Sequence, residues 1–436
     1  MPIRRFLLLW LLLWAALAPA QDQRRLTILH TNDLHARLLP DGNGQGGFAR
    51  VAAAVRRERA GCNSCLLLNG GDLVQGSPVS TLYRGVPIYQ VANSLGIDVS
   101  TVGNHEFDYG WRLIPEFLRV ARFPTVSANL QDEKGRLLVR RPHVILQVNG
   151  LRVAVIGALT ADLAELTMPE TTGPWRALPV VEALRPRVRE LRDRSDLIVL
   201  LAHISNREED EVLSRLPEVS VVVSGHVHRG LESPKKVGDR LAVRVRAYGV
   251  ELGRLDLTVD LRSKTVVESQ WRRIPIDAAI PPANDVARLV QRWEGRVSRV
   301  VDVPIGEAVR DIAGADLKRL MEQSMAEGVG AELAFMNQGG IRDFFPKGRL
   351  LARHVWNVMP FDNRVVKGRF RGRELPAAVT QGRQIDPDRE YTLAVNDFTA
   401  AHQQAEMGSS GHAFPEVGRR QRDLLLEWIR KKKVLD

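Results

Sequence analysis

Cysteine is scarce in this chain, and its scarcity excludes several kinds of site. Only two of the 436 residues are cysteine, Cys62 and Cys65, and they are spaced C-x-x-C. Two thiols cannot form a four-cysteine zinc site, and the surrounding sequence lacks the setting of a thioredoxin-like redox motif. In an oxidising compartment the pair could close a small loop just before a strand. We therefore favour a structural disulfide over free thiols.

Long apolar runs are missing after the first twenty residues. Arg4 and Arg5 precede one apolar stretch, residues 6–18, which is shorter than the roughly 20 residues needed to span a bilayer. Small residues at positions 18–20 suit a cleavage site. We predict a signal peptide over residues 1–20, cleaved after Ala20, and a periplasmic or secreted protein. The absence of a cysteine directly after the run argues against a lipid anchor, so we expect no stable membrane anchor.

Negative charge is in deficit, with 51 acidic residues against 62 Lys and Arg and a formal net charge of +11. Such an excess attracts acidic substrates or anionic surfaces, although a solvated basic surface explains it equally well. Aromatic residues make up 6% of the chain, and no basic motif with interleaved aromatics stands out. We therefore expect no nucleic-acid polymer as a partner.

Alternating strand and helix patterns predict an α/β fold. Hydrophobic residues form 44% and charged residues 26% of the sequence, which are globular values. At about 100–200 residues per domain, the length predicts two or three domains. We place one domain at 21–278 and a linker helix at 279–300, which begins after Pro281 and Pro282 with Asn284 as its expected cap. A second, smaller α/β domain covers 301–436.

Apolar periodicity gives the expected elements. It predicts helices over 48–59, 79–95 and 178–194, and short strands over 241–259. In the second domain it predicts strands over 332–336, 363–370 and 391–395, before a final helix whose basic end, 430–433, suits the negative end of a helix dipole. The expected apolar face of the linker helix consists of Val286, Leu289, Val290, Trp293, Val297 and Val300.

Five short polar blocks stand at or near the ends of apolar runs, each of which predicts a buried strand. The runs are 26–29, 66–68, 98–102, 196–201 and 219–223. Open α/β sheets bind ligands at the carboxyl ends of their strands, so distant blocks could converge on one crevice. The blocks contain Asp33 and His35, Asp72, Asn104 with His105 and Asp108, His203, and His226 with His228.

Seven of these residues predict a site for two divalent metal ions, because Asp, Asn and His are the ligands that such sites use. Residues two apart on an extended segment point to the same side, which pairs Asp33 with His35 and His226 with His228. A single Asp or His at a strand end is more often structural. Five of the ten histidines lie in these blocks, and seven candidate ligands in this order reverse that expectation.

The blocks resemble the calcineurin-like metallophosphoesterase signature. More closely, they resemble the bacterial 5′-nucleotidase and 2′,3′-cyclic phosphodiesterase family, which is exported and has two domains. This resemblance implies a four-layer αββα metallophosphoesterase sandwich followed by a smaller α/β substrate-binding domain of the 5′-nucleotidase type. The motifs that carry it are His30-Thr31-Asn32-Asp33-Leu34-His35, Gly70-Gly71-Asp72, Gly103-Asn104-His105-Glu106-Phe107-Asp108, Gly225-His226-Val227-His228, Asn337-Gln338-Gly339-Gly340-Ile341-Arg342 and Pro360-Phe361-Asp362-Asn363.

The resemblance also implies roles for the metal-site residues. Asp72 would bridge two divalent ions, with Mn, Zn or Co expected, and such ions lower the pKa of bound water to about 7. His105 would stabilise the phosphoryl transition state or protonate the leaving oxygen, and Asp108 would orient it. Alternatively, the two residues form a buried hydrogen-bonded pair with a structural role only. The remaining ligands would divide into Asp33, His35 and His228 on one ion and Asn104, His203 and His226 on the other.

In the second domain the resemblance implies that Asn337 and Arg342 hold a nucleotide. It also implies that Phe361 and Phe414 sandwich the base and that Arg310 supplies a further substrate arginine. The chain departs from the family pattern in three places. Residues 410–413 replace a Gly-Gly-Asp-Gly segment, residues 315–318 replace an Asn-Leu-Gly motif, and residues 371–390 replace a much longer stretch. These differences predict an abbreviated second domain.

The leading hypothesis is an exported dinuclear phosphohydrolase that cleaves nucleoside 5′-monophosphates, a small-molecule substrate. Alternative enzymes are a 2′,3′-cyclic nucleotide phosphodiesterase with 3′-nucleotidase activity, a UDP-sugar hydrolase, or a phosphatase with weak base preference. A family branch acts on sulfur-oxidation intermediates, and no residue singles it out here. From another class comes a metal-containing nucleotide-binding protein without turnover, against which the intact His105 and Asp108 pair argues. A structural zinc module is weaker still, because such sites use four closed ligands.

Overall fold

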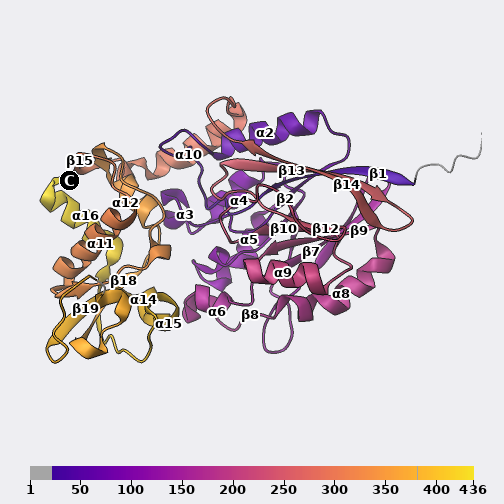
Figure 1. The fold of residues 1–436 in the computed structure, drawn as a ribbon. Helices are drawn as coiled ribbons and strands as arrows, with labels where there is room; N and C mark the ends of the chain where they lie inside the picture. The colour runs from indigo at the N-terminus through magenta and orange to yellow at the C-terminus, as the bar shows by residue number, and fades with distance from the viewer. Residues whose placement is uncertain (1–21, 381) are drawn as a thin grey trace, which may run out of the picture.

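The computed structural model describes residues 22–380 and 382–436, which form two α/β parts joined by a long helix (Figure 1). The predicted signal peptide lies outside the described residues. Within the described ranges, none of the helices combines the length and apolar character that crossing a membrane requires.

The first part contains two six-stranded sheets. In the first sheet the order is β14-β13-β1-β2-β3-β4. Its four strands β1 to β4 run parallel, and β13 and β14 extend the sheet antiparallel. Parallel strands are buried on both faces, which is why the apolar runs are continuous rather than alternating. The bounds are β1 Gln23–Thr31, β2 Cys65–Asn69, β3 Val99–Thr101, β4 Thr125–Val126, β13 Glu251–Asp260 and β14 Thr265–Pro275.

The second sheet has the order β11-β12-β10-β9-β7-β6. Here β7, β9, β10 and β12 are parallel, and the two edge strands are antiparallel. Both sheets therefore direct the carboxyl ends of central strands toward one side, as the strand-end blocks predict. The bounds are β6 His143–Val148, β7 Leu151–Leu159, β9 Leu197–His203, β10 Val221–Gly225, β11 Lys235–Val237 and β12 Arg240–Val243.

The two sheets pack face to face with helices outside them. Leu26 and Leu68 of the first sheet share one apolar core with Val153 and Val199 of the second. Figure 1 shows α2 on one outer side and α8 and α9 on the other. This confirms the four-layer αββα arrangement. The helices of this part are α2 Phe48–Ala60, α3 Pro78–Leu82, α4 Val86–Ala92, α5 Ile114–Val120, α6 Leu163–Leu166, α7 Pro169–Thr172, α8 Val180–Arg194 and α9 Asn206–Arg215.

Three details of the sequence reading are wrong. The single helix expected over 79–95 is divided into α3 and α4, because Gly85 adopts a left-handed backbone (φ 80°) and Pro87 opens a new helix. The linker helix, α10 (Asn284–Val301), receives no side-chain cap from Asn284, which is already its first helical residue. Val300 is 52% exposed, and Val301 is buried in its place.

The second part contains a three-stranded sheet, β17-β15-β21, and a four-stranded sheet, β16-β19-β18-β20. The predicted strands over 363–370 and 391–395 are present as β18 and β19, whereas the one expected over 332–336 shortens to the two residues of β16. The strands are β15 Pro304–Ala308, β16 Leu333–Ala334, β17 Gly348–Leu351, β18 Arg364–Arg371, β19 Glu390–Asn396, β20 Glu416–Arg420 and β21 Val434–Leu435. The helices are α11 Gly314–Val329, α12 Ala352–Val358, α13 Ala377–Thr380, α14 Asp397–Ala401, α15 Gln403–Met407 and α16 Gln421–Lys432.

Three further features complete the fold. Cys62 and Cys65 form a disulfide in the turn between α2 and β2, which agrees with the pairing favoured from their spacing. The two parts also approach each other away from α10: α6 and α15 face each other across the gap in Figure 1, and His402 Nε2 lies 3.2 Å from Ala164 O. The short antiparallel pair of β5 (Leu130–Gln131) and β8 (Arg176–Ala177) lies in the first part.

Candidate metal centre

The carboxyl ends of five strands bring all seven predicted ligands to one place. Asp33 and His35 follow β1, Asp72 follows β2 and Asn104 follows β3. His203 is the last residue of β9, and His226 and His228 follow β10. The two sheets thus contribute to one site because their central strands end on the same side.

The backbone at these ends is left-handed rather than extended, which corrects the geometry expected from the spacing. The φ angles are 50° at Asp33, 46° at His35, 51° at Asp72, 79° at His226 and 60° at His228. Such a conformation costs a non-glycine residue about 1–3 kcal/mol and concentrates at functional sites. The backbone therefore turns sharply at each of these strand ends and directs the side chains toward their common centre.

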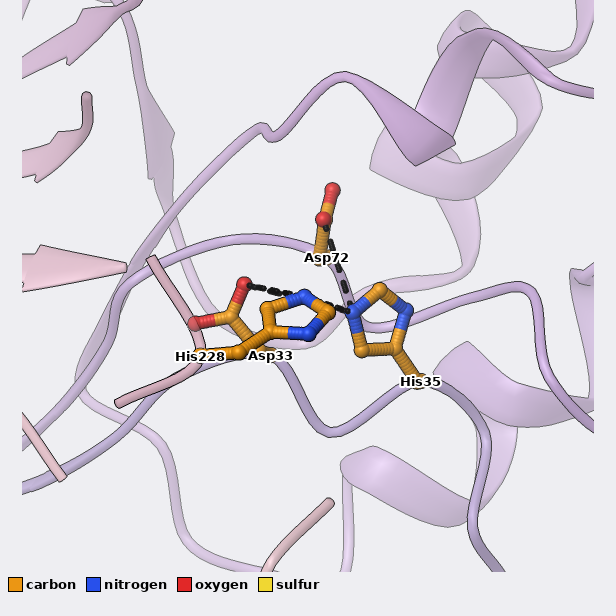
Figure 2. A group of neighbouring side chains, drawn as sticks. All are labelled: Asp33, His35, Asp72 and His228. Atoms are coloured by element: carbon orange, nitrogen blue, oxygen red, sulfur yellow. Dashed lines mark hydrogen bonds and ion pairs between the residues drawn. The ribbon is translucent and has the colours of Figure 1, made fainter. Parts of the chain in front are cut away.

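Four of the side chains form a tight group (Figure 2). One ligand atom from each of Asp33, His35, Asp72 and His228 lies within 4.8 Å of the others. His35 Nε2 is 2.9 Å from His228 Nε2 and 3.7 Å from Asp72 Oδ2, and His228 Nε2 is 3.6 Å from Asp33 Oδ1. Two carboxylates and two imidazoles facing one point form a donor set suited to a divalent cation.

The other three predicted ligands form a second group that shares Asp72. His203 Nε2 lies 3.2 Å from Asn104 Oδ1 and 3.1 Å from Asp72 Oδ2. The rings of His203 and His226 have centroids 5.1 Å apart. Asp72 therefore lies between the two groups, which is the position of a bridging carboxylate.

The pKa values of the ionisable groups in this cluster reflect their burial and the charges of their neighbours. Burial lowers the pKa of His35 well below its usual range and lowers that of His228 to about 4, so these imidazoles are neutral and keep a lone pair for a ligand. Burial alone would raise the pKa of Asp72, but His203, His105 and His35 hold it well below its usual range. Burial also opposes charge on His203, yet Asp72 and Asp33 raise its pKa to about 10.

These values indicate that the cluster attracts positive charge, and the contacts fit a metal site. Asp72 Oδ2 is buried, and among the described residues its close polar neighbours are the imidazole nitrogens of His203 at 3.1 Å and His35 at 3.7 Å. A buried carboxylate costs free energy unless positive charge compensates it, which a bound cation would supply. The residues present therefore fit a divalent metal site that contains Asp72.

Neighbouring groups orient the ligands, as is usual at metal sites. His203 Nδ1 lies 2.8 Å from Gly70 O, which directs Nε2 toward the cluster. Asn32 Nδ2 donates to Asp33 Oδ2 at 2.7 Å and to Val245 O at 3.0 Å. Gly103 is required by close approach, because a Cβ there would lie 2.0 Å from Asp72 Oδ1.

His105 and Asp108 form the expected pair beside the cluster. His105 Nδ1 lies 2.7 Å from Asp108 Oδ2, which leaves Nε2 free to face a substrate, and both residues line the adjacent cavity. Burial lowers the pKa of His105, but Asp108 and Asp72 outweigh it, so the pKa is raised above its ordinary value. The pair is thus arranged for a histidine that carries a proton.

A cavity of about 620 Å³ opens from the cluster toward the second part of the chain. Asn337, Arg342 and Phe361, three of the residues expected to bind substrate, line it. Arg342 Nη2 lies 3.3 Å from His35 Nε2, and its guanidinium is 5.9 Å from the centre of the Phe361 ring. Residues from both parts therefore enclose one space beside the candidate metal centre.

Two predicted substrate residues do not reach this cavity. Phe414 packs against Phe370 (centroids 5.3 Å apart) at the edge of an apolar cluster of the second part. Arg310 is half-exposed and pairs with Asp316 at 2.8 Å. A second aromatic side chain from this part of the chain does line the cavity, Phe398, at the start of α14. Its only signal in the sequence is its place two residues after the strand end at Asn396.

Comparisons with known proteins agree with this geometry. Residues 26–230 match the model of the calcineurin-like phosphoesterases, and residues 296–381 match that of the 5′-nucleotidase C-terminal domain. The chain belongs to the calcineurin-like phosphoesterases with a 5′-nucleotidase C-terminal domain. The phosphoesterase family match and the 5′-nucleotidases among its relatives show that the chain is a phosphoester hydrolase.

Individual relatives span different lengths. Protein UshA of Yersinia enterocolitica is 25% identical over 97% of this chain and 94% of its own length. The 5′-nucleotidase of Vibrio vulnificus is 26% identical over 83% of this chain and 75% of its own. Endonuclease YhcR of Bacillus subtilis is 26% identical over 87% of this chain, which spans only 37% of that protein.

Solved structures support the fold. A 5′-nucleotidase precursor from Thermus thermophilus superposes with a TM-score of 0.85 at 25% identity and covers 94% of this chain and 97% of its own. The sulfate thiohydrolase SoxB from the same organism reaches a TM-score of 0.82 at 19% identity, covering 96% of both chains. At that identity the likeness to SoxB concerns the fold alone.

Glu106 is a residue of this phosphoesterase whose importance the sequence reading missed. Its carboxylate is fully buried and accepts three backbone N–H groups from two metal-binding loops: Asp72 at 3.1 Å, Leu73 at 2.9 Å and Gly103 at 2.6 Å. In return, Asp72 Oδ1 accepts the N–H of His105 at 3.0 Å. These bonds hold the left-handed backbone of Asp72 and so position its carboxylate.

We expect Glu106→Gln to lower metal affinity by about 10- to 100-fold, the usual effect of losing an orienting contact at a metal site. The amide cannot accept all three N–H groups, because its nitrogen is a donor. Calorimetric titration with Mn²⁺ measures the effect. Asp132→Asn is a matched control, because Asp132 is also buried and accepts two backbone N–H groups, from Lys134 and Arg136, in a turn outside the metal loops. Unchanged affinity in Glu106→Gln would contradict the assigned role.

Proposed function

We propose that this phosphoesterase uses two divalent ions, Mn, Zn or Co, to hydrolyse nucleoside 5′-monophosphates to nucleoside and phosphate. One observation carries the proposal: a single cavity joins the ligand cluster, His105 and Arg342 to Asn337 and the rings of Phe361 and Phe398. A phosphate fits beside the ligand cluster, His105 and Arg342. A planar base with its sugar fits beside Asn337 and the aromatic rings. The named 5′-nucleotidases among its relatives support the same substrate class.

The proposed reaction adds water across the phosphoester, so that the bond from phosphorus to the ester oxygen breaks. When bound, the two ions supply an activated water and neutralise charge on the phosphoryl oxygens. Arg342 binds the phosphate from the side of the second domain, near His35. His105, oriented by Asp108, gives a proton to the leaving oxygen.

The organic part of the substrate is proposed to lie between Phe361 and Phe398. Both rings line the cavity on the side of the second domain, and aromatic rings stack on nucleobases with about 1–3 kcal/mol per base. Asn337 is held by Asn396, whose Nδ2 donates to its Oδ1 at 2.9 Å, and it lines the cavity beside these rings. Glu406 of α15 also lines the cavity, and burial raises the pKa of its carboxyl group.

Export is part of the proposal. The N-terminal pattern of two arginines and an apolar run supports a signal peptide over residues 1–20, and a disulfide is typical of exported proteins. We further propose domains at 21–278 and 301–436 joined by 279–300. The position of α10, which begins after the first matched family region and ends just inside the second, supports these boundaries.

A substrate panel tests the proposed function. The metal-loaded protein is assayed with AMP, 2′,3′-cyclic AMP, UDP-glucose, bis-p-nitrophenyl phosphate and a non-nucleotide monoester. We expect the highest kcat/KM with AMP. Preference for the cyclic substrate would indicate a cyclic phosphodiesterase instead, and equal rates on AMP and the non-nucleotide ester would indicate a phosphatase without base selection. Metal binding without turnover of any member would indicate a binding protein.

We expect Phe398→Ala to raise KM for AMP by about 10- to 100-fold, because stacking of one base is worth about 1–3 kcal/mol. The rate on p-nitrophenyl phosphate, which lacks a base, should stay within about twofold. Phe414→Ala is the matched control, since Phe414 packs on Phe370 away from the cavity. A larger rise of KM in Phe414→Ala than in Phe398→Ala would restore Phe414 as the stacking residue.

A further inference from the structure

Arg37 lies two residues after His35, and its side chain crosses to the C-terminal domain. Its Nη1 donates to Asp343 Oδ2 at 2.6 Å, and its Nη2 donates to Arg342 O at 2.8 Å. The side chains of Arg37 and Asp343 are only 13% and 19% exposed. Water and salt screen such a shielded pair less than they screen a surface pair. The contact joins two segments that are matched by different family models.

The same guanidinium packs on Tyr248, which borders the candidate metal centre. It lies 5.0 Å from the centre of the Tyr248 ring, a cation–π contact. That ring is 5.4 Å from the ring of His35 and 5.5 Å from that of His228. The backbone N–H of Tyr248 donates to Asp33 O at 2.7 Å. One face of Arg37 therefore touches the residues around the ligands, while its donors hold the other domain.

Arg342 is the residue that this contact holds. Its carbonyl accepts from Arg37, and its own N–H donates to Val358 O at 2.9 Å, so both polar groups of its backbone are engaged. Its side chain extends into the cavity to within 3.3 Å of His35 Nε2. A shift of the 342–343 segment would therefore move the guanidinium away from the candidate metal centre.

We propose that Arg37 and Asp343 form a positioning pair that fixes Arg342 beside the metal centre and thereby sets the affinity of the site for phosphate. The proposal rests on the proposed function, in which Arg342 binds the phosphate group. Arg37 itself does not line the large cavity. We therefore expect Arg37 to act through Arg342. Displacement of a binding group by about 1 Å can lower the rate by up to about 100-fold.

The test compares Arg37→Met, Asp343→Asn and their double variant. Met keeps an unbranched apolar stem but lacks the guanidinium donors, and Asn keeps the shape of Asp343 without its charge. Arg353→Met is the matched control, because Arg353 pairs with Glu294 of α10 at the same domain junction without touching Arg342. The measurements are the dissociation constant of inorganic phosphate on the metal-loaded protein, KM and kcat for AMP, and amide exchange over residues 340–346.

We expect each single variant to weaken phosphate binding and raise KM by about tenfold or more, with kcat changed less. The double variant should bind phosphate no more weakly than Arg37→Met, because the contact that Asp343→Asn weakens is already absent in Arg37→Met. Amide exchange over 340–346 should accelerate, whereas Arg353→Met should leave phosphate affinity within about twofold. Unchanged phosphate affinity and exchange in Arg37→Met, or additive effects in the double variant, would overturn the proposal. Weaker phosphate binding in a protein that hydrolyses no nucleotide would support the positioning pair and refute the proposed substrate.

Discussion

Asp72→Asn is expected to abolish both tight metal binding and turnover. Asp72 contacts both ligand groups, His35 on one side and His203 on the other, so its charge serves both ions. Metal ions supply several kcal/mol of transition-state stabilisation, and 1.36 kcal/mol corresponds to a tenfold change in rate. We therefore expect kcat/KM to fall by about a thousandfold or more.

The measurement is metal content after dialysis together with the rate on AMP and p-nitrophenyl phosphate. Chelation of the unaltered protein should reproduce the loss, and Mn²⁺, Zn²⁺ or Co²⁺ should restore activity. The apo form of Asp72→Asn should unfold no earlier than the unaltered apo protein, because the change removes a buried charge and the amide oxygen can still accept the N–H of His105. Full activity of the chelated protein would refute metal-dependent hydrolysis.

His105→Asn is expected to keep its metal and lose rate. His105 lies beside the ligands and bonds to Asp108 through Nδ1 at 2.7 Å, with its other nitrogen toward the cavity. Loss of a proton donor typically costs about 10²–10⁴-fold in rate. The unaltered metal content separates this variant from Asp72→Asn.

A pH–rate profile distinguishes the two roles considered for His105. If it donates a proton to the leaving oxygen, kcat falls as the pH rises through its pKa, and this fall is missing in His105→Asn. Asp108 raises that pKa, so Asp108→Asn should move the fall to lower pH. His143→Asn, on the edge strand β6 of the second sheet, is the matched control and should leave kcat unchanged. A His105 variant with full rate would reduce the pair to a structural contact.

Local apolar patterns in the sequence predicted much of this fold. The apolar runs that form β1, β2, β9 and β10 are continuous because each strand is buried between layers. Such runs can be recognised in the sequence without knowing which strands lie beside them. Helix α2 and the strands β18 and β19 were likewise recognised from the apolar pattern of their own residues. The division of α3 from α4 was missed because Gly85 and Pro87 were weighed less than the apolar pattern around them.

The substrate end of the site was harder to foresee. Phe414 stands in the expected sequence neighbourhood but packs on Phe370, whereas Phe398 reaches the cavity from the end of β19. Which of two phenylalanines faces the cavity depends on the packing inside the second domain, where Phe414 joins the cluster of Phe370, and on how that domain is placed against the first. That placement results from contacts such as Arg37 with Asp343, which are 306 positions apart. No local pattern encodes such a pairing.

By itself, the sequence determined the α/β class, the strand-end positions of the seven candidate ligands and the adjacent His105 and Asp108. It could do so because parallel strands of one sheet end at a common edge, so residue type and position along the strand suffice. Only the tertiary structure decided the left-handed turns that aim Asp33 and Asp72, the buried bonds of Glu106, and the placement of Arg342 by Arg37. These features depend on distances between segments that are remote in the chain, and those distances arise when the layers and the two domains pack.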